Sequence, residues 1–543
     1  MRRYLPSLLL GLLWVTGGVV RAAEPPAATA TTATPDPVTV GIATLLNGTD
    51  PVLVDGERVD VRMLRGLYEP RGYRPLWVGG GDAATRGKAI TAAIDRAAAH
   101  GLDPAAYHRQ AIGKRMAATT PADRAALDVI TSDGLMHLVV HLRLGAIPAR
   151  AVGDDIAIEG RPVDPQGLAE QAAAAPELSA FVDGVAPSSP AYRGLVDALA
   201  RYRAAAAAGG WPPVPTKGPN VTPGMSDAVV PLVRQRLAAT GELEAPAEPE
   251  GDPKVYDDKL AEAVKAFQGR NGLPKDGTLG AATRAALAVP VGDRISQITV
   301  NLERARWLPQ DLGRRYVAVN VPSFDLRLVE DGKPVLEMPV VVGRTDRPTP
   351  LLATQITGVI FNPTWTVPPT LLKKDFLPRM QRNQSFLARR GIQVVSHRVS
   401  GGDAVGRVTL RQPPGPKNPL GRVKFHMPNG FAVYLHDTNA KYLMQQPRRA
   451  LSSGCVRVGN ALGLADQLLL NDARWTTARR KQFLSDWTTR SVPLRDPVPI
   501  YILYQTAWAD EDGQVHSRVD LYGRDVALAK ALSQTARSRL PST

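Results

Sequence analysis

The stretch from Phe431 to Val458 reads FAVYLHDTNAKYLMQQPRRALSSGCVRV and contains the only cysteine of the chain, Cys455. The alternation in FAVYLH predicts a β-strand that ends at His436. A polar loop leads from this histidine to the cysteine, and the apolar pattern after it predicts a helix that begins next to Cys455. About twenty residues separate the two side chains, which is enough chain to turn and return beside the strand.

This arrangement suits nucleophilic catalysis by a thiol. A thiol attacks as its thiolate, and a neighbouring imidazole or a helix N-terminus promotes its ionisation. Gly454 lets the backbone turn tightly, so amides in the Ser453-Gly454-Cys455 loop could form an oxyanion hole, and Arg457 could bind a substrate carboxylate or orient the loop. A lone cysteine is more often a small buried hydrophobe, but its Ser-Ser-Gly-Cys-Val-Arg context favours a nucleophile.

These residues resemble the catalytic motif of the YkuD-type L,D-transpeptidases, in which a histidine precedes Ser/Thr-His-Gly-Cys-x-Asn/Arg by about twenty residues. The chain has Ser453 where many members have histidine and Arg457 where many have asparagine. The long periplasmic branch is similar to the chain at both positions. A second resemblance is FNPTWTVPP, residues 361–369, which looks like the family's segment beside the catalytic cleft and contains Trp365.

Composition and the first residues indicate the compartment. The chain has 543 residues and a net charge of +15, but its basic residues form no stripe with interleaved aromatics, which argues against nucleic acid. Residues 1–23 have paired arginines, an apolar run and a small-residue site, typical of an export signal, with an uncleaved membrane anchor as the alternative. An exported chain with one cysteine has no intramolecular disulfide.

We expect a multidomain α+β protein with a helical scaffold, a small three-helix peptidoglycan-binding domain and a mostly-β catalytic domain with an inserted capping subdomain. Strand periodicity is expected from Ile295 onwards, and the stretch Glu330–Lys333 predicts a hairpin turn. The expected divisions are a tether at 24–37, the scaffold at 38–225, the peptidoglycan-binding-like domain at 226–291, the catalytic domain at 295–510 with its capping insertion at 369–422, and a C-terminal extension at 511–543.

Two features outside the catalytic segment have competing interpretations. His137 and His141 stand one helical turn apart, as zinc ligands do, but they lack the glutamate of a metalloprotease motif, so a plain helix face is favoured and no metal is expected. The three-helix segment is similar to a wall-binding domain at Phe267-Gln268, Asp276-Gly277 and Thr283. A helical spacer without ligand affinity is its alternative.

The family resemblance implies a peptidoglycan transferase that needs no cofactor. Cys455 would attack a tetrapeptide stem and form a thioester, His436 would carry the proton, and a diamino-acid acceptor would complete a 3→3 cross-link. Tyr434 and Trp365 are expected to line the pocket. His426 is the second candidate for the base, and either Asp437 or a backbone carbonyl could orient His436.

Other acceptors leave rival functions open. Water at the same site would give an L,D-carboxypeptidase, and a protein lysine would give a wall-anchoring transferase. A non-catalytic wall-binding scaffold is the alternative from a different class. For the enzyme we expect a periplasmic location, a possible inner-membrane anchor, a role in cell-wall organisation, acylation by carbapenem-type reagents, and possible partners among wall-synthesis proteins.

Overall fold

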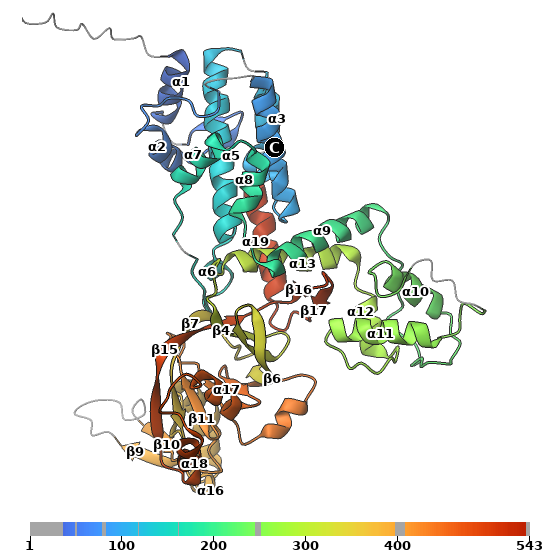
Figure 1. The fold of residues 1–543 in the computed structure, drawn as a ribbon, viewed down its shortest axis with the longest axis vertical. Coiled ribbons are helices and arrows are strands. Elements are labelled where there is room, and N and C mark those ends of the chain that lie inside the picture. Colours follow the sequence, from blue (N-terminus) through green and yellow to red (C-terminus); the bar gives the residue numbers. More distant parts are fainter. Residues whose placement is uncertain are drawn as a thin grey trace, which may run out of the picture.

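The structure, a computed structural model, describes residues 36–48, 51–78, 83–117, 119–160, 162–244, 251–396 and 408–538. The proposed export signal and most of the tether lie outside these ranges. Three parts are visible in Figure 1: a helical part at one end, a smaller helical part at the side, and a β-rich part at the other end. The long helices α9 (Pro190–Ala207) and α13 (Val291–Arg306) lie between them.

The helical part is built around α5 (Pro121–Leu144). Thr120 caps its N-terminus by accepting a hydrogen bond from the Asp123 amide, and Pro121 occupies the first turn, where it needs no amide partner. Among the described residues, α5 is the one helix long and apolar enough to cross a membrane, but 89% of its apolar window is buried inside the protein. Around it lie α1 (Pro37–Leu46), β1 (Leu53–Val54), β2 (Glu57–Arg58), α2 (Val61–Tyr68), α3 (Ala83–Ala99), α4 (Arg109–Arg115), α7 (Pro165–Ala174) and α8 (Leu178–Val185).

The side part contains α10 (Val230–Ala238), α11 (Asp258–Arg270) and α12 (Ala281–Leu287) in the segment where three short helices are predicted. Asp257 caps α11 by accepting from the Leu260 amide. These helices bury a core of their own that includes Val264 and Phe267. A separate core of this kind is what an independently packed module requires.

The β-rich part is a closed barrel. Its strands are joined in the order β11-β12-β14-β6-β5-β4-β15-β7, and a pairing between β7 and β11 closes the ring. Closure removes the free sheet edges. The bounds are β4 (Arg315–Asn320), β5 (Asp325–Glu330), β6 (Lys333–Gly343), β7 (Leu351–Phe361), β11 (Val423–His426), β12 (Leu435–His436), β14 (Val456–Val458) and β15 (Arg490–Leu503), with β13 (Ala450–Ser452) paired to β6.

The predicted hairpin and inserted subdomain are both present as folded structure. Asp331 and Gly332 have positive φ between β5 and β6, as a tight hairpin turn requires. The insertion forms a small sheet of β8 (Trp365–Thr366), β10 (Val408–Gln412) and β9 (Gln393–Ser396), with short helices α14 (Pro369–Leu371), α15 (Leu377–Arg382) and α16 (Phe386–Arg390). Its core contains Val367, Phe376, Ile392 and Leu410.

Three sequence predictions about elements were wrong. Strand structure does not begin at Ile295, because Val291–Arg306 is the helix α13 and the barrel starts at Arg315. Only Leu435 and His436 of FAVYLH form a strand, since Ala432 adopts a positive φ that interrupts it. The helix after Cys455 is α17 (Ala461–Leu468), capped by Asn460, and strand β14 separates it from the cysteine.

A strand pairing and several helix contacts join the helical part to the β-rich part. Strand β3 (Ile156–Ala157) comes from the segment assigned to the scaffold, yet it pairs with the start of β7. The C-terminal helix α19 (Arg524–Ser538), whose packing partner the sequence did not indicate, contacts α13 and α6 (Ala149–Val152), and Arg304 forms an ion pair with Asp525. A hairpin of β16 (Ala507–Ala509) and β17 (Val515–Ser517) lies against α9 and α11.

Candidate active site

Three neighbouring barrel strands present the candidate residues on one face. In the ladders, Lys424 of β11 is opposite His436 of β12, and His436 is opposite Arg457 of β14. Their neighbours Val423, Leu435 and Val456 are buried in the barrel core. Because successive side chains of a strand point to opposite faces, the polar residues stand on the outer face of the barrel wall. Cys455 lies at the start of β14, next to Tyr434.

Tyr434 joins the cysteine to the histidine. Its ring centroid lies 5.6 Å from that of His436 in an edge-to-face arrangement. Burial, together with the neighbouring Cys455 thiol, raises the pKa of the Tyr434 phenol well above its usual value. In the described part of the chain no hydrogen bond links the thiol directly to the imidazole. The structure therefore brings the three predicted residues into one cluster with tyrosine at its centre.

The backbone carbonyl of Asp437 orients His436. Nδ1 of the imidazole donates to this carbonyl oxygen, which fixes the tautomer that leaves Nε2 as a proton acceptor. Burial, aided by the positive charge of Arg457, lowers the pKa of His436 to about 3. The sequence left both a carboxylate and a carbonyl open for this role, and the carbonyl holds it.

The Asp437 carboxylate is fixed separately. Its Oδ2 accepts from the Arg422 amide at 2.8 Å, and its Oδ1 pairs with Lys441. Gly421 approaches so closely that a Cβ there would lie 2.3 Å from Oδ2. The tight turn at Gly421, with φ near +60°, thus fixes the residue whose carbonyl holds the imidazole.

Cys455 is not at a helix N-terminus, because β14 follows it directly. The expected dipole stabilisation of a thiolate is therefore absent. Burial raises the pKa of the Cys455 thiol, against smaller opposing effects of Tyr434 and the Lys424 and Arg457 charges. The resting site favours a neutral thiol beside a neutral imidazole.

The loop before the cysteine is held by its own hydrogen bonds. Gly454 has φ of +114°, its amide donates to Ser452 Oγ, and its carbonyl accepts from Thr349 Oγ1 at 2.8 Å. The Gly454 amide is therefore already engaged, contrary to its expected role as an oxyanion donor. The Ser453 hydroxyl oxygen accepts from Arg347 at 3.3 Å, which leaves its own O–H able to donate.

Comparison with known families identifies the domains. Residues 314–500 match the model of the YkuD family, described as an L,D-transpeptidase catalytic domain. This segment of the chain is thus similar to YkuD-type L,D-transpeptidase domains. Residues 226–287 match a family described as "Putative peptidoglycan binding domain", and residues 62–199 match one described as a scaffold domain.

Individual proteins similar to this chain include one curated relative and two solved structures. A protein of Haemophilus influenzae named "Putative L,D-transpeptidase" is 31% identical over 284 residues, covering 50% of this chain and 56% of that protein. The match thus spans little more than half of the relative's length. An L,D-transpeptidase from Mycobacterium smegmatis aligns with 35% of this chain and 58% of its own at 14% identity and a TM-score of 0.20. One from Xylanimonas cellulosilytica aligns with 53% and 100% at 16% identity and a TM-score of 0.18.

Trp365 and Arg457 lie at the edges of the candidate cluster. Trp365 hydrogen-bonds to Tyr434, which lowers the pKa of that phenol slightly against the other effects. It also packs against Phe376 of the inserted subdomain, with ring centroids 6.0 Å apart. Arg457 interacts electrostatically with Cys455 and Tyr442, and its buried Nε has no hydrogen-bond partner. Both residues are placed where they could contact a substrate.

The sequence missed Lys424 and Arg347. Lys424 stands opposite His436, and its Nζ lies 4.0 Å from the centroid of the Tyr434 ring. Arg347 joins Ser453 to Asp375 of the inserted subdomain. A sequence signal existed for Lys424, because VKFH alternates in the same way as a barrel strand, but only the strand pairing shows that it faces the histidine.

The remaining histidines have other surroundings. His426, the second candidate for the base, is exposed and hydrogen-bonds to Thr357. His137 bonds to the Asp133 carbonyl, and His141 bonds to Tyr107. Within the described ranges, no group of three or more metal-binding side chains is found.

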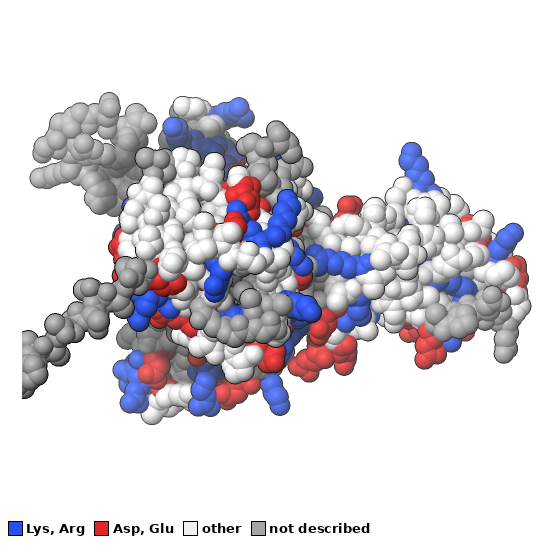
Figure 2. Space-filling model, turned by 90° about the horizontal axis from the view of Figure 1, so that it is seen from above, with Lys and Arg blue, Asp and Glu red and all other residues white. Residues whose placement is uncertain are grey.

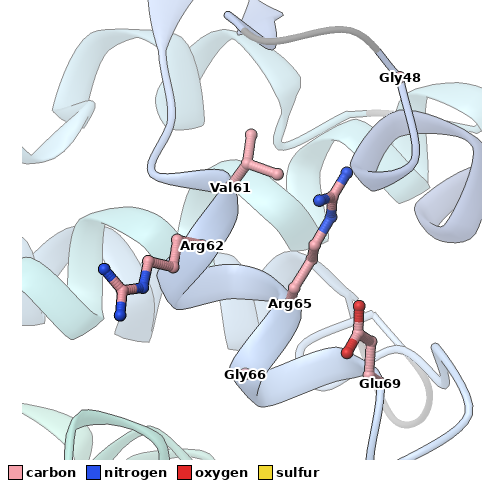
Figure 3. A pocket seen from close by; sticks show the side chains of 6 residues that line it. All are labelled: Gly48, Val61, Arg62, Arg65, Gly66 and Glu69. Atoms are coloured by element: carbon pink, nitrogen blue, oxygen red, sulfur yellow. The ribbon is translucent and has the colours of Figure 1, made fainter.

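A hollow on the scaffold and the charges of one face can be compared with the candidate cluster. A hollow of about 560 Å³ on the scaffold is lined by Gly48, Val61, Arg62, Arg65, Gly66 and Glu69, which supply no nucleophile (Figure 3). Arg65 there donates to the Leu46 carbonyl and so caps α1. Figure 2 shows basic and acidic side chains interspersed on the visible face, without a continuous basic stripe.

Proposed function

We propose that this chain is a peptidoglycan L,D-transpeptidase that forms 3→3 cross-links through a thioester on Cys455. The sulfur attacks the carbonyl at the L-centre of the third residue of a tetrapeptide stem, and the C–N bond to the terminal D-alanine breaks. The side-chain amine of an acceptor stem then attacks the thioester carbonyl, forms the new amide bond and releases the thiol.

The supporting observation is the cluster of Cys455, Tyr434 and His436 within a transpeptidase domain. His436 Nε2 takes the thiol proton during attack and delivers it to the departing amine. Because its pKa is lowered to about 3, the resting imidazole is neutral at working pH and its Nε2 carries no proton, but the same lowering makes it a weak base, so the proton moves as the sulfur attacks and not before. Tyr434 interacts with the sulfur and lies beside the imidazole.

Substrate binding is assigned to the outer rim. We assign Arg457, with its unpaired buried Nε, to a carboxylate of the stem peptide. Trp365 and the inserted subdomain form a wall over the bound stem. The peptidoglycan-binding domain would hold the enzyme on its polymer, and the proposed place of action is the periplasm, with residues 1–23 as the export signal.

The experiment is intact-mass spectrometry of the purified chain after incubation with a tetrapeptide stem. We expect an acyl adduct with loss of D-alanine, and no adduct on Cys455→Ala. A wild-type chain that remains unmodified, or an alanine variant that still cross-links stems, would overturn the proposal. Product masses separate the acceptors: a cross-linked dimer indicates transpeptidation, a tripeptide indicates hydrolysis, and a stem joined to a protein lysine indicates anchoring.

A further inference from the structure

Lys424 occupies an unusual position for a barrel lysine. It lies opposite His436 in the β11–β12 ladder and is half-buried on the outer face of the wall. Its ammonium stands over the Tyr434 ring, with Nζ 4.0 Å from the ring centroid. Both Lys424 and Tyr434 interact electrostatically with Cys455, so the ammonium and the phenol act on the same thiol.

No carboxylate in the described part of the chain forms an ion pair with Lys424. The nearest acidic group along β12, Asp437, is paired with Lys441. Arg457 of β14, on the same face, is also a cation and interacts electrostatically with Cys455 and with the phenol of Tyr442. Long lysine side chains usually extend their charge into water, whereas this one keeps a partly desolvated charge beside a nucleophile.

We propose that Lys424 is a positioning residue of the reaction centre whose positive charge stabilises the Cys455 thiolate as it forms. The role in turnover rests on the proposed function, whereas the effect on the thiol does not. Of the two fixed cations, Arg457 is reserved for the substrate carboxylate, which would neutralise it on binding. Lys424 then remains as the charge that faces the sulfur when its proton leaves for His436 Nε2.

The surroundings explain why such a charge is needed. Burial raises the pKa of the Cys455 thiol, and Lys424 and Arg457 oppose that rise. The same cations lower the pKa of His436, so they favour the deprotonated form of both groups. Tyr434 has a raised pKa and stays neutral, which leaves Lys424 as the charge on β11 that acts on the thiol.

The test follows the rate of iodoacetamide alkylation against pH. Since Cys455 is the only cysteine, the reagent reports on this thiol alone. A neighbouring opposite charge typically shifts a pKa by ~1 unit or more, so Lys424→Met should raise the pH midpoint of alkylation by ~1 pH unit and slow alkylation at neutral pH by ~10-fold. Lys424→Arg keeps the charge and should restore most of the rate.

Lys333→Met is the matched control, because Lys333 is an exposed lysine at the far end of β6 and the same charge is removed. Its midpoint should equal that of the wild type. Lys424→Gln repeats the test with a polar side chain if the methionine variant does not fold. The proposal is overturned if the neutral variants keep the wild-type midpoint, or if the arginine variant shifts as far as they do.

The two proposals fail in different ways. A shifted midpoint in a chain that does not process stems would support the role of Lys424 and overturn the proposed function. Stem acylation with an unshifted midpoint would support the function and overturn the role of Lys424. With both intact, Lys424→Met should lower kcat for acylation and leave KM nearly unchanged, because the charge acts on the sulfur rather than on stem binding.

Discussion

Single backbone positions determine where the reacting side chains stand. Gly421 and Gly454 both have positive φ, a region that glycine enters without the cost that a side chain imposes. Gly454 directly precedes the candidate nucleophile Cys455, and Gly421 makes room for the Asp437 carboxylate. The backbone therefore orients the His436 imidazole: Gly421 fixes Asp437, and the Asp437 carbonyl accepts from Nδ1 of the ring.

Gly421→Ala should slow stem acylation by ~10-fold or more and destabilise the protein by ~1–2 kcal/mol, because its Cβ would collide with Asp437 and force a residue with a side chain to φ near +60°. Acylation rates and thermal unfolding check this. Gly430→Ala is the control, since a Cβ at Gly430 meets nothing within 4 Å. Equal behaviour of the two variants would contradict the assigned role of Gly421.

His436 should also make the fold sensitive to acid. Its folded pKa is about 3, below the ordinary 6.5, so the unfolded chain binds a proton between these values that the folded chain does not. Its stabilising contribution is complete above pH 6.5 and is lost as the pH falls towards 3, by on the order of 3 to 5 kcal/mol at most. Denaturant unfolding at several pH values should show a smaller acid loss in His436→Gln. The exposed His426→Gln should keep the wild-type loss, and the opposite ranking would refute the prediction.

At the scale of elements, one ion pair joins the inserted subdomain to the catalytic loop. Arg347 pairs with Asp375, which lies in the turn between α14 and α15, and also donates to Ser453. The Arg347 side chain is only 12% exposed, so this pair is screened less than a surface pair. The contact places the subdomain core beside the loop that presents Cys455.

Asp375→Asn should therefore loosen the subdomain and reduce stem acylation by ~3- to 10-fold, while iodoacetamide, which is too small to need the wall, should react at the wild-type rate. Parallel measurement of the two rates checks this. Asp331→Asn removes an exposed partner of Arg314 at a hairpin turn and serves as control. If both rates fell in parallel, the Arg347–Asp375 ion pair would be supporting the loop that presents Cys455 and not the inserted subdomain.

At the scale of the whole molecule, the helical part contributes to the catalytic core. Ile147, Ile156 and Ile158 are buried among barrel residues although they belong to the segment assigned to the scaffold. Arg524 of α19 pairs with Asp155 beside β3. The expected boundaries at residues 225 and 295 therefore divide the sequence but not the fold. Residues from both sides of these boundaries form the barrel.

Ile156→Ala should cost ~2–4 kcal/mol in the barrel, because Ile156 is 2% exposed and pairs with the start of β7. Hydrogen exchange at Leu351 and Leu352 should become faster, even though the substitution lies outside the transpeptidase segment. Val40→Ala, at a position that is 49% exposed on α1, should leave these amides unchanged. Unchanged exchange in the isoleucine variant would mean that β3 does not stabilise β7.

The sequence by itself determined the order of helical and β-rich segments and the candidate pair of Cys455 and His436. A single cysteine in a Ser-Ser-Gly-Cys-Val-Arg context, a histidine upstream, and changes of hydrophobic period along the chain are local signals, so they survive without a structure. The three helices of the wall-binding segment and the hairpin at Asp331-Gly332 are local in the same sense.

Only the tertiary structure decided how these parts act on one another. The pairing of β11, β12 and β14 brings Lys424, His436 and Arg457 to one face, and no local pattern encodes which strands become neighbours. The same holds for strand β14, which separates Cys455 from the predicted helix α17, for the carbonyl that holds His436, and for strand β3, which comes from the segment assigned to the scaffold. Each depends on contacts between residues distant in sequence, because burial and strand pairing, rather than local preference, set their free energy.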